Sequence, residues 1–161
     1  MSKVAACFLA LAMFVTLPAA NAGDAVPAFK LPGMDGKQHE LTEWRNKVVL
    51  LNFWASWCSP CQTEIRDLVA FQTQYAAQGL QIVGIGLDDE KKLRNVQRSL
   101  GINYPVLVDI SSGPTVMEGL GNRDGVVPYS VLISREGKVL YTHMGLLDKV
   151  ILTDEVIPRL K

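Results

Sequence analysis

Cys58 and Cys61 are the residues of this sequence whose type and spacing most clearly allow covalent chemistry. Two cysteines separated by Ser59 and Pro60 can form a disulfide and reopen it by exchange with other thiols. Such a bond closes a very small loop, so it constrains the unfolded chain little. We therefore predict a redox-active Cys58–Cys61 disulfide rather than a structural one.

The segments on either side of this pair predict how it is held. Residues 48–54 form an apolar run interrupted only by Asn52, which is typical of a strand buried on both faces. A helix is expected from about Cys58 to a C-cap at Gly79. The free N–H groups and partial positive charge of a helix N-terminus stabilise a thiolate, which is the nucleophile in disulfide exchange. We expect Cys58 to be exposed and to attack, and Cys61, one turn deeper, to resolve the mixed disulfide.

The remaining pattern alternates strands and helices along one domain. Short extended pieces flank a turn at residues 33–36, strands are expected at 81–87 and 106–109, and helices at 90–100 and 111–120. An antiparallel hairpin at 130–134 and 139–144 and a helix at 148–160 complete the chain, and Pro158 is expected to fray or bend the end of that helix. This order predicts an α/β three-layer sandwich, with a mixed central sheet flanked by helices, an N-terminal β-hairpin and a central insertion.

The first 22 residues differ from the rest. Lys3 precedes an apolar run from residue 4 to 17, and Ala20–Asn21–Ala22 resembles a cleavage site. We predict a signal peptide over residues 1–22, with an uncleaved N-terminal anchor as the alternative, and a single domain over 23–161. Fourteen apolar residues are few for a membrane span, so none is expected after cleavage. Cys7 would leave with the signal peptide.

Composition excludes some partners. The chain has 16 basic and 16 acidic residues, and this balance gives no reason to expect a nucleic-acid partner, which would need a basic face. A zinc site would need about four ligands. Only His39 and His143 could complete one with the two cysteines, and they lack metal-type spacing, so no metal site is predicted.

Trp57–Cys58–Ser59–Pro60–Cys61, following Asn52–Phe53–Trp54, resembles the thioredoxin superfamily and specifically its exported TlpA/ResA/CcmG branch. The resemblance extends over most of the chain after residue 23. It implies a thioredoxin-like fold, a cis peptide bond before Pro128, and substrate contacts by the Val127 backbone, Pro128, Trp57 and Pro60. Trp54 and Trp57 are expected to pack around the disulfide as shielding groups.

The same resemblance draws attention to three further positions. It implies that Glu64, one turn beyond Cys61, tunes the cysteines and moves protons, although an exposed helix glutamate is the alternative. Asn52 stands where cytoplasmic thioredoxins have a buried aspartate, and an amide cannot accept the proton of Cys61. That duty would pass to Glu64, water or the substrate. Arg66 replaces a helix-kinking proline of the family, so the helix is expected to be straighter.

The resemblance implies an exported or periplasmic enzyme that needs no cofactor besides its redox pair. The Ser59–Pro60 dipeptide lacks a histidine that would stabilise the reactive thiolate strongly, which favours reduction of substrates. The implied partners are exported proteins with disulfides and a membrane thiol donor of the DsbD/CcdA type. Apocytochrome c is one implied client.

Two other classes share parts of this pattern. A peroxiredoxin-like peroxidase would need a threonine two or three residues before its reactive cysteine, where this chain has Ala55–Ser56–Trp57. A Sco-like copper chaperone would need three residues between its cysteines and a histidine near the cis-proline. Here two residues separate the cysteines, and Tyr129–Ser130 follow Pro128.

Overall fold

The computed structural model describes residues 22–110 and 115–161; the predicted signal peptide and residues 111–114 lie outside this part of the chain, apart from Ala22. The strands are β1 (Lys30–Pro32), β2 (Gln38–Glu40), β3 (Val48–Trp54), β4 (Leu80–Gly86), β5 (Val106–Val108), β6 (Tyr129–Ile133) and β7 (Val139–Met144). The α-helices are α1 (Ser59–Tyr75), α2 (Glu90–Leu100), α3 (Val116–Gly119) and α4 (Lys149–Val156). The 3-10 helices are η1 (Leu41–Trp44), η2 (Ala76–Gln78) and η3 (Ile157–Leu160).

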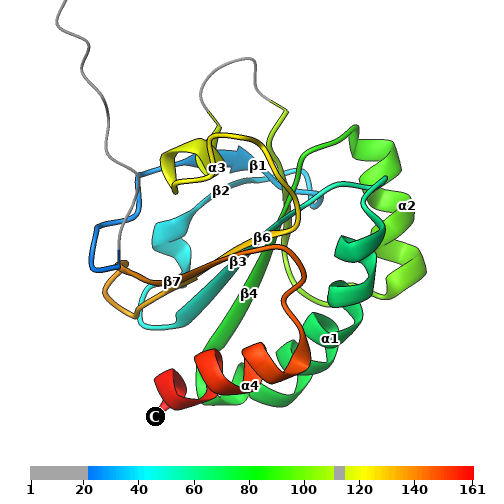
Figure 1. The fold of residues 1–161 in the computed structure, drawn as a ribbon. Helices are drawn as coiled ribbons and strands as arrows, with labels where there is room; N and C mark the ends of the chain where they lie inside the picture. The colour runs from blue at the N-terminus through cyan, green and yellow to red at the C-terminus, as the bar shows by residue number, and fades with distance from the viewer. Residues whose placement is uncertain (1–21, 111–114) are drawn as a thin grey trace, which may run out of the picture.

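Five strands form one mixed sheet in the order β5-β4-β3-β6-β7, and β1 and β2 form a separate antiparallel hairpin. β3 is central, parallel to β4 and antiparallel to β6. The segment between β4 and β6 contains α2, β5 and α3 and forms the insertion in the middle of the chain. Figure 1 shows α1, α2 and α4 gathered on one side of this sheet, with β1, β2 and α3 on the other. The architecture is the predicted three-layer thioredoxin-like sandwich, with one outer layer built mainly from the hairpin and short helices.

The two faces of β3 explain why its apolar run is continuous. All seven of its residues are buried. Val49, Leu51 and Phe53 pack toward the hairpin and α3, whereas Val48, Leu50 and Trp54 pack toward the long helices. Asn52 lies on the helix side as the one polar residue of the strand, at 0 % exposure. A strand covered on both faces therefore brings an amide beneath α1.

Most predicted elements are confirmed to within one or two residues. β3 and α2 have the predicted ends, and Gly79 closes the α1–η2 segment in a left-handed conformation with φ of 94°. The helix predicted over 148–160 is confirmed together with the disturbance expected near Pro158, because α4 ends at Val156 and the 3-10 helix η3 follows it. Pro158 has no N–H to donate to the carbonyl four residues earlier, which explains why the α-helical hydrogen bonding does not continue through it. The start of the predicted 111–120 helix falls outside the described residues, and α3 begins after Thr115.

His39 joins the β1–β2 hairpin to the helix that follows it. Its Nε2 atom lies 3.0 Å from Asp35 Oδ1, its Nδ1 atom lies 2.8 Å from Glu43 Oε2, and its ring stacks on Trp44. The hydrogen bonds to Asp35 and then to Glu43 raise the pKa of His39 above its ordinary value. Both ring nitrogens of His39 thus contact carboxylates, so His39 connects the hairpin to η1.

Replacing His39 with glutamine should therefore lower stability mainly in acid. A histidine whose pKa is raised in the folded state contributes fully below about pH 6.5, and this contribution is lost as the pH rises through the folded pKa. Urea unfolding at pH 5.5 and 8.5 should show the larger loss for His39→Gln at pH 5.5. His143→Gln is the matched control, because His143 contacts Tyr141 Oη and Leu146 O rather than a carboxylate. Equal losses in the free energy of unfolding for His39→Gln at both pH values would contradict this role of His39.

Candidate active site

Cys58 and Cys61 are joined by a disulfide at the start of α1. Their Sγ atoms are 2.05 Å apart and their Cα atoms 5.3 Å apart. Cys58 is the N-cap residue of the helix, and its Sγ accepts a hydrogen bond of 3.2 Å from the backbone N–H of Cys61. Pro60 lies in the first turn, where its missing N–H leaves no gap in the helix. The predicted position of the first sulfur, at the positive end of a helix, is confirmed.

The prediction that Cys58 is exposed is wrong. Cys58 is 4 % exposed and Cys61 0 %. Both belong to an apolar cluster with Met34, Trp54, Ile65 and four further residues, namely Ala55, Leu93, Val106 and Val108. The hairpin and the insertion bring Met34 and Val106 to this cluster, and their backbones are joined by a hydrogen bond of 2.9 Å. Elements distant in sequence therefore cover the helix start, and only a small part of Cys58 reaches the surface.

Glu64 lies in the interior beneath the disulfide. It is 0 % exposed, which excludes the alternative of a surface glutamate on the helix. Its Oε1 accepts a hydrogen bond of 2.5 Å from Asn52 Nδ2, and its Oε2 accepts one of 2.7 Å from the backbone N–H of Leu147. Burial raises the pKa of Glu64 to about 7, against the lowering effect of these two hydrogen bonds. This carboxyl can therefore change its protonation near neutral pH.

The loop that enters β6 reaches the apolar cluster that contains the disulfide. The Val127–Pro128 peptide bond is cis, as predicted. Val127 is half-buried and packs on the cluster that contains both cysteines. The carbonyl of Pro128 accepts a hydrogen bond of 2.8 Å from the N–H of Gly145. The structure thus brings Val127 to the cluster of the Cys58–Cys61 pair, although it is about 70 residues from Cys58 in sequence, and Pro128 is buried beside it in the chain.

The two tryptophans have different positions. Trp54 is fully buried, as predicted for a packing group. Trp57 is 72 % exposed, so the prediction that it packs as a shield is wrong. It follows the end of β3 and precedes the helix cap, where the chain turns toward solvent. Pro60 is also exposed. Trp57 and Pro60 thus remain available for contact with a substrate beside Cys58.

Three residues of the site were not found from the sequence. The Ser130 hydroxyl accepts a hydrogen bond of 3.1 Å from Asn52 Nδ2. Asn122 closes the loop before Val127, since its side chain bonds both the N–H and the carbonyl of Val126. Leu147 supplies its backbone N–H to Glu64 across 83 positions. The contribution of Leu147 comes from its backbone N–H, which residues of almost any type possess, so the sequence gives no indication of it. Ser130 and Asn122 look in the sequence like ordinary polar residues of a strand and a loop.

Arg66 does not interrupt α1. The helix is assigned without a break from Ser59 to Tyr75, and the Arg66 side chain is exposed. The residues of α1 that face the sheet are buried, including Cys61, Glu64, Ile65 and Leu68. Replacing the family's proline by arginine thus leaves Cys61 and Glu64 three residues apart on one continuous helix.

Within residues 22–110 and 115–161, no group of three or more histidines, cysteines or acids is arranged to hold a metal ion. His39 and His143 are engaged elsewhere, with carboxylates in the first case and with Tyr141 Oη and Leu146 O in the second.

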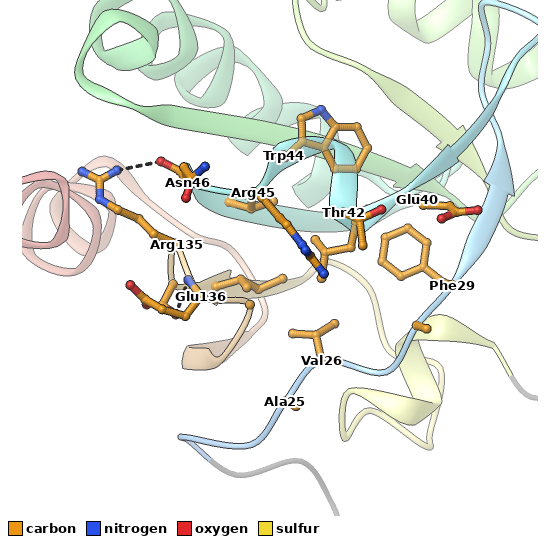
Figure 2. Close-up of a pocket in the computed structure, with 16 residues that line it drawn as sticks. Ala25, Val26, Phe29, Glu40, Thr42, Trp44, Arg45, Asn46, Arg135 and Glu136 are labelled. Atoms are coloured by element: carbon orange, nitrogen blue, oxygen red, sulfur yellow. Dashed lines mark hydrogen bonds between the residues drawn. The ribbon is translucent and has the colours of Figure 1, made fainter.

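A cavity of about 580 Å³ lies near the opposite end of the central strand, and Figure 2 shows it. Its lining includes Val49 of β3 and Trp44 of η1. Val26 and Phe29 line it from the N-terminal segment, as Figure 2 shows. Arg135 closes part of the rim by donating a hydrogen bond of 3.3 Å to the carbonyl of Asn46. None of the predicted site residues lines this cavity, so it is separate from the disulfide.

The fold and the C-x-x-C disulfide at a helix start define a thioredoxin-like thiol–disulfide oxidoreductase, which is an enzyme. The model of the AhpC/TSA family matches residues 22–142. The chain is 31 % identical over 145 residues to the thiol-disulfide oxidoreductase ResA of Bacillus subtilis (strain 168), covering 89 % of this chain and 78 % of that protein. It is 29 % identical over 137 residues to the ResA of Geobacillus thermodenitrificans (strain NG80-2), covering 84 % and 76 %.

Solved structures agree with this result. A Chlorobium tepidum protein assigned as the thiol:disulfide interchange protein DsbE superposes with a TM-score of 0.81 at 32 % identity, covering 89 % of this chain and all of that chain. A second thiol:disulfide interchange protein, from Chlorobium tepidum TLS, superposes with a TM-score of 0.75 at 29 % identity, with the same coverage. The chain belongs to the AhpC/TSA family and, within it, to the thioredoxin-like oxidoreductases of the TlpA/ResA/CcmG type.

Proposed function

We propose that this protein reduces disulfides in exported proteins through the Cys58–Cys61 pair. The observation that carries the proposal is the position of this disulfide, with Cys58 capping α1 and the cis-Pro128 loop packed beside it. A helix N-terminus favours the Cys58 thiolate, and the adjoining loop offers the Val127 backbone to an extended client segment. No cofactor beyond the two sulfurs is required, and neither a nucleic acid nor a metal takes part.

The reaction follows from the order of the two cysteines along the helix. In the reduced protein the Cys58 thiolate attacks one sulfur of a client disulfide, and the other client sulfur leaves as a thiolate. Cys61 then gives up its proton, and its thiolate attacks Cys58 Sγ in the mixed disulfide. The second client thiolate leaves, and the Cys58–Cys61 disulfide is restored. Two electrons pass to the client in each cycle.

Glu64 is the group best placed to take the proton of Cys61. Both residues lie buried on α1, three positions apart, and the pKa of about 7 allows Glu64 to accept a proton and later release it. Asn52, which lies beneath the same turn, can only orient the carboxyl by donating its amide hydrogen to Oε1. The proton therefore passes between two buried side chains of α1, whereas the client binds at the protein surface.

The reducing direction determines the partners. A reductase in an oxidising compartment must itself be reduced, and we propose a membrane thiol donor of the DsbD/CcdA type. Its clients are exported proteins with disulfides, and apocytochrome c, in cytochrome c maturation, is one candidate. Residues 1–22 would direct the chain to the periplasm, as a signal peptide or as an anchor. Among the described residues, no helix has the length and apolar character needed to cross a membrane.

The redox potential tests the direction. The oxidised fraction of Cys58–Cys61 in glutathione or dithiothreitol buffers of known potential can be counted by alkylation and mass. We expect a potential nearer the value of about −270 mV of thioredoxin than the value of about −120 mV of DsbA. A potential near −120 mV would contradict a reductase and indicate an oxidant. Peroxide consumption faster than insulin reduction would favour the peroxidase alternative, and copper retained through purification would favour the Sco-like one.

A further inference from the structure

A tight turn joins β3 to α1 and ends on the reactive cysteine. The backbone N–H of Cys58 donates a hydrogen bond of 3.1 Å to the carbonyl of Ala55, so Ser56 and Trp57 are the two central residues of the turn. Trp57 is largely exposed, whereas Cys58 is buried and caps α1. The conformation of this turn therefore sets where the Cys58 sulfur lies relative to the helix start.

Ser56 is held from two sides. Its carbonyl accepts a hydrogen bond of 2.8 Å from Gln62 Nε2, and its hydroxyl donates a hydrogen bond to Asp88 Oδ2. Gln62 belongs to α1, the helix that Cys58 itself caps, whereas Asp88 follows β4. The hydroxyl of Ser56 thus connects the turn to a second, separate element of the fold.

The sheet brings Asp88 to the turn. β3 and β4 are parallel with Trp54 opposite Gly86, and the N–H of Leu87 donates a hydrogen bond of 2.9 Å to the carbonyl of Trp54. The carboxyl ends of the two strands therefore meet at one edge of the sheet, where loops from parallel strands commonly build sites. Asp88 is placed beside the turn in this way, although it is 32 positions from Ser56 in the sequence.

The Asp88 carboxylate is itself fixed by the start of α2. Its Oδ1 accepts hydrogen bonds of 2.7 Å from the Asp89 N–H and of 3.1 Å from Lys92 Nζ, which leaves Oδ2 for Ser56. The hydrogen bonds from Ser56 and then from the Asp89 N–H hold the pKa of Asp88 below its ordinary value. A hydrogen bond to an ionised acceptor is roughly twice as strong as one between neutral groups. Asp88 is therefore a charged and immobilised acceptor for the hydroxyl of the turn.

We propose that Asp88 is a positioning residue for Cys58, and that through the Ser56 hydroxyl it fixes the turn so that the Cys58 sulfur lies at the start of α1. There the sulfur accepts the Cys61 N–H, and the positive end of the helix stabilises its thiolate. In the oxidised protein the disulfide also holds Cys58, so the turn matters most once the disulfide is reduced. This role rests on the proposed attack by Cys58, since it concerns the reactivity of the same sulfur.

The test is the reaction of iodoacetamide with Cys58 in the reduced protein, measured against pH and read on the Cys58 peptide by mass. Ser56→Ala removes the hydroxyl and leaves the charge of Asp88 in place. We expect it to raise the pKa of the Cys58 thiol by about half a unit to one unit, so that alkylation below this pKa slows about threefold to tenfold. An unchanged profile in folded Ser56→Ala would overturn the proposal.

Ser56→Thr is the conservative variant, because threonine keeps a hydroxyl at the same position of the side chain. It should retain the wild-type alkylation profile of Cys58. If Ser56→Thr shifted this profile as far as Ser56→Ala, the hydroxyl would not be the cause, and the proposal would be wrong.

The part played by Asp88 is tested by combining substitutions. Asp88→Ala removes the acceptor, but the loss of a negative charge by itself lowers the pKa of a nearby thiol. Comparing Asp88→Ala with the double variant Asp88→Ala/Ser56→Ala cancels this effect, because both lack the carboxylate. We expect Ser56→Ala to raise the pKa of Cys58 in the wild type and to leave it unchanged in the Asp88→Ala background. Equal shifts in both backgrounds would show that the hydroxyl acts without Asp88.

Asp89→Ala is the matched control for a loss of stability alone. Asp89 is the N-cap of α2, and its side chain accepts hydrogen bonds from N–H groups in the first turn of that helix. The variant should therefore unfold at a lower urea concentration and keep the wild-type alkylation profile of Cys58. A shift in Asp89→Ala as large as that in Ser56→Ala would mean that any loosening near α2 moves the thiol, which would contradict a specific role of Asp88.

Two features keep the outcome clear. If Asp88→Ala does not fold, the comparison of Ser56→Ala with Ser56→Thr decides alone, since neither changes a charge. Alkylation by iodoacetamide needs no client protein. A failure here thus concerns the turn before Cys58, whereas failure of the reductase proposal would appear in the potential.

Discussion

Cys58→Ser should abolish disulfide exchange, so that insulin reduction with dithiothreitol proceeds at the rate measured without the protein. Cys58 caps α1 and accepts the Cys61 N–H, so its sulfur is the one stabilised as a thiolate by the helix terminus. A serine hydroxyl can replace this cap, so the variant should fold. It cannot attack a disulfide at neutral pH. The loss should therefore be catalytic, with the unfolding transition retained in circular dichroism.

Cys61→Ser is the partner experiment and should have a different result. Its Cys58 can still attack a client, but no second sulfur is present to resolve the mixed disulfide. Expressed in the exporting cell, this variant should accumulate covalent adducts that dithiothreitol releases, and the released proteins are the clients. The Cys58→Ser/Cys61→Ser double variant is the control and should capture nothing. If Cys58→Ser trapped clients and Cys61→Ser did not, the roles of the two cysteines would be reversed.

The low exposure of Cys58 bears on both cysteine experiments, because each depends on access to this sulfur. The helix start is where the sequence places it, but Cys58 belongs to an apolar cluster that also contains Met34 and Val106, and it is only 4 % exposed. The membership of the chain among thiol–disulfide oxidoreductases shows that such a pair is compatible with exchange.

The central elements could be predicted because local patterns determine them. The uninterrupted apolar run of β3 and the Asp89 cap and Gly101 stop of α2 specify their own ends, and the structure reproduces them. The cis bond before Pro128 and the fold followed from the resemblance, since proline alone would favour trans. The change from α4 to η3 was likewise expected from Pro158, which cannot donate a backbone N–H within a helix.

The surroundings of the site could not be predicted for a physical reason. The burial of Glu64 depends on α1 packing on β3 and on the Leu147 N–H before α4, contacts that connect distant parts of the chain. The sequence placed Glu64 on the correct side of α1 but could not distinguish an exposed carboxylate from a buried one. The burial of Cys58 depends likewise on tertiary packing, since its apolar cluster includes Met34 and Val106 from elements distant in sequence.

Glu64→Gln should flatten the dependence of stability on pH. A carboxyl whose pKa rises from 4.5 to about 7 on folding keeps a proton that the unfolded chain has already lost. Rising pH through this window therefore favours unfolding. A difference of this size corresponds to about 3 kcal/mol, which wild type should lose between pH 4 and pH 8 because of Glu64. Urea unfolding of wild type and Glu64→Gln at both pH values measures it as the difference between the two losses.

Asp67→Asn is the matched control, an acid-to-amide change on the same helix at a half-buried position, and it should keep the wild-type slope. The glutamine amide must turn its N–H toward one of two donors, Asn52 Nδ2 or the Leu147 N–H, which lowers the stability of the variant. This loss of stability is the same at both pH values, so it cancels from the difference between them. In the reduced protein, Glu64→Gln should also remove the step near pH 7 from the alkylation of the cysteines, because an amide cannot take up a proton. A wild-type slope together with an unaltered alkylation profile would reduce Glu64 to a packing residue, and the proton of Cys61 would then have to leave through the client or through water.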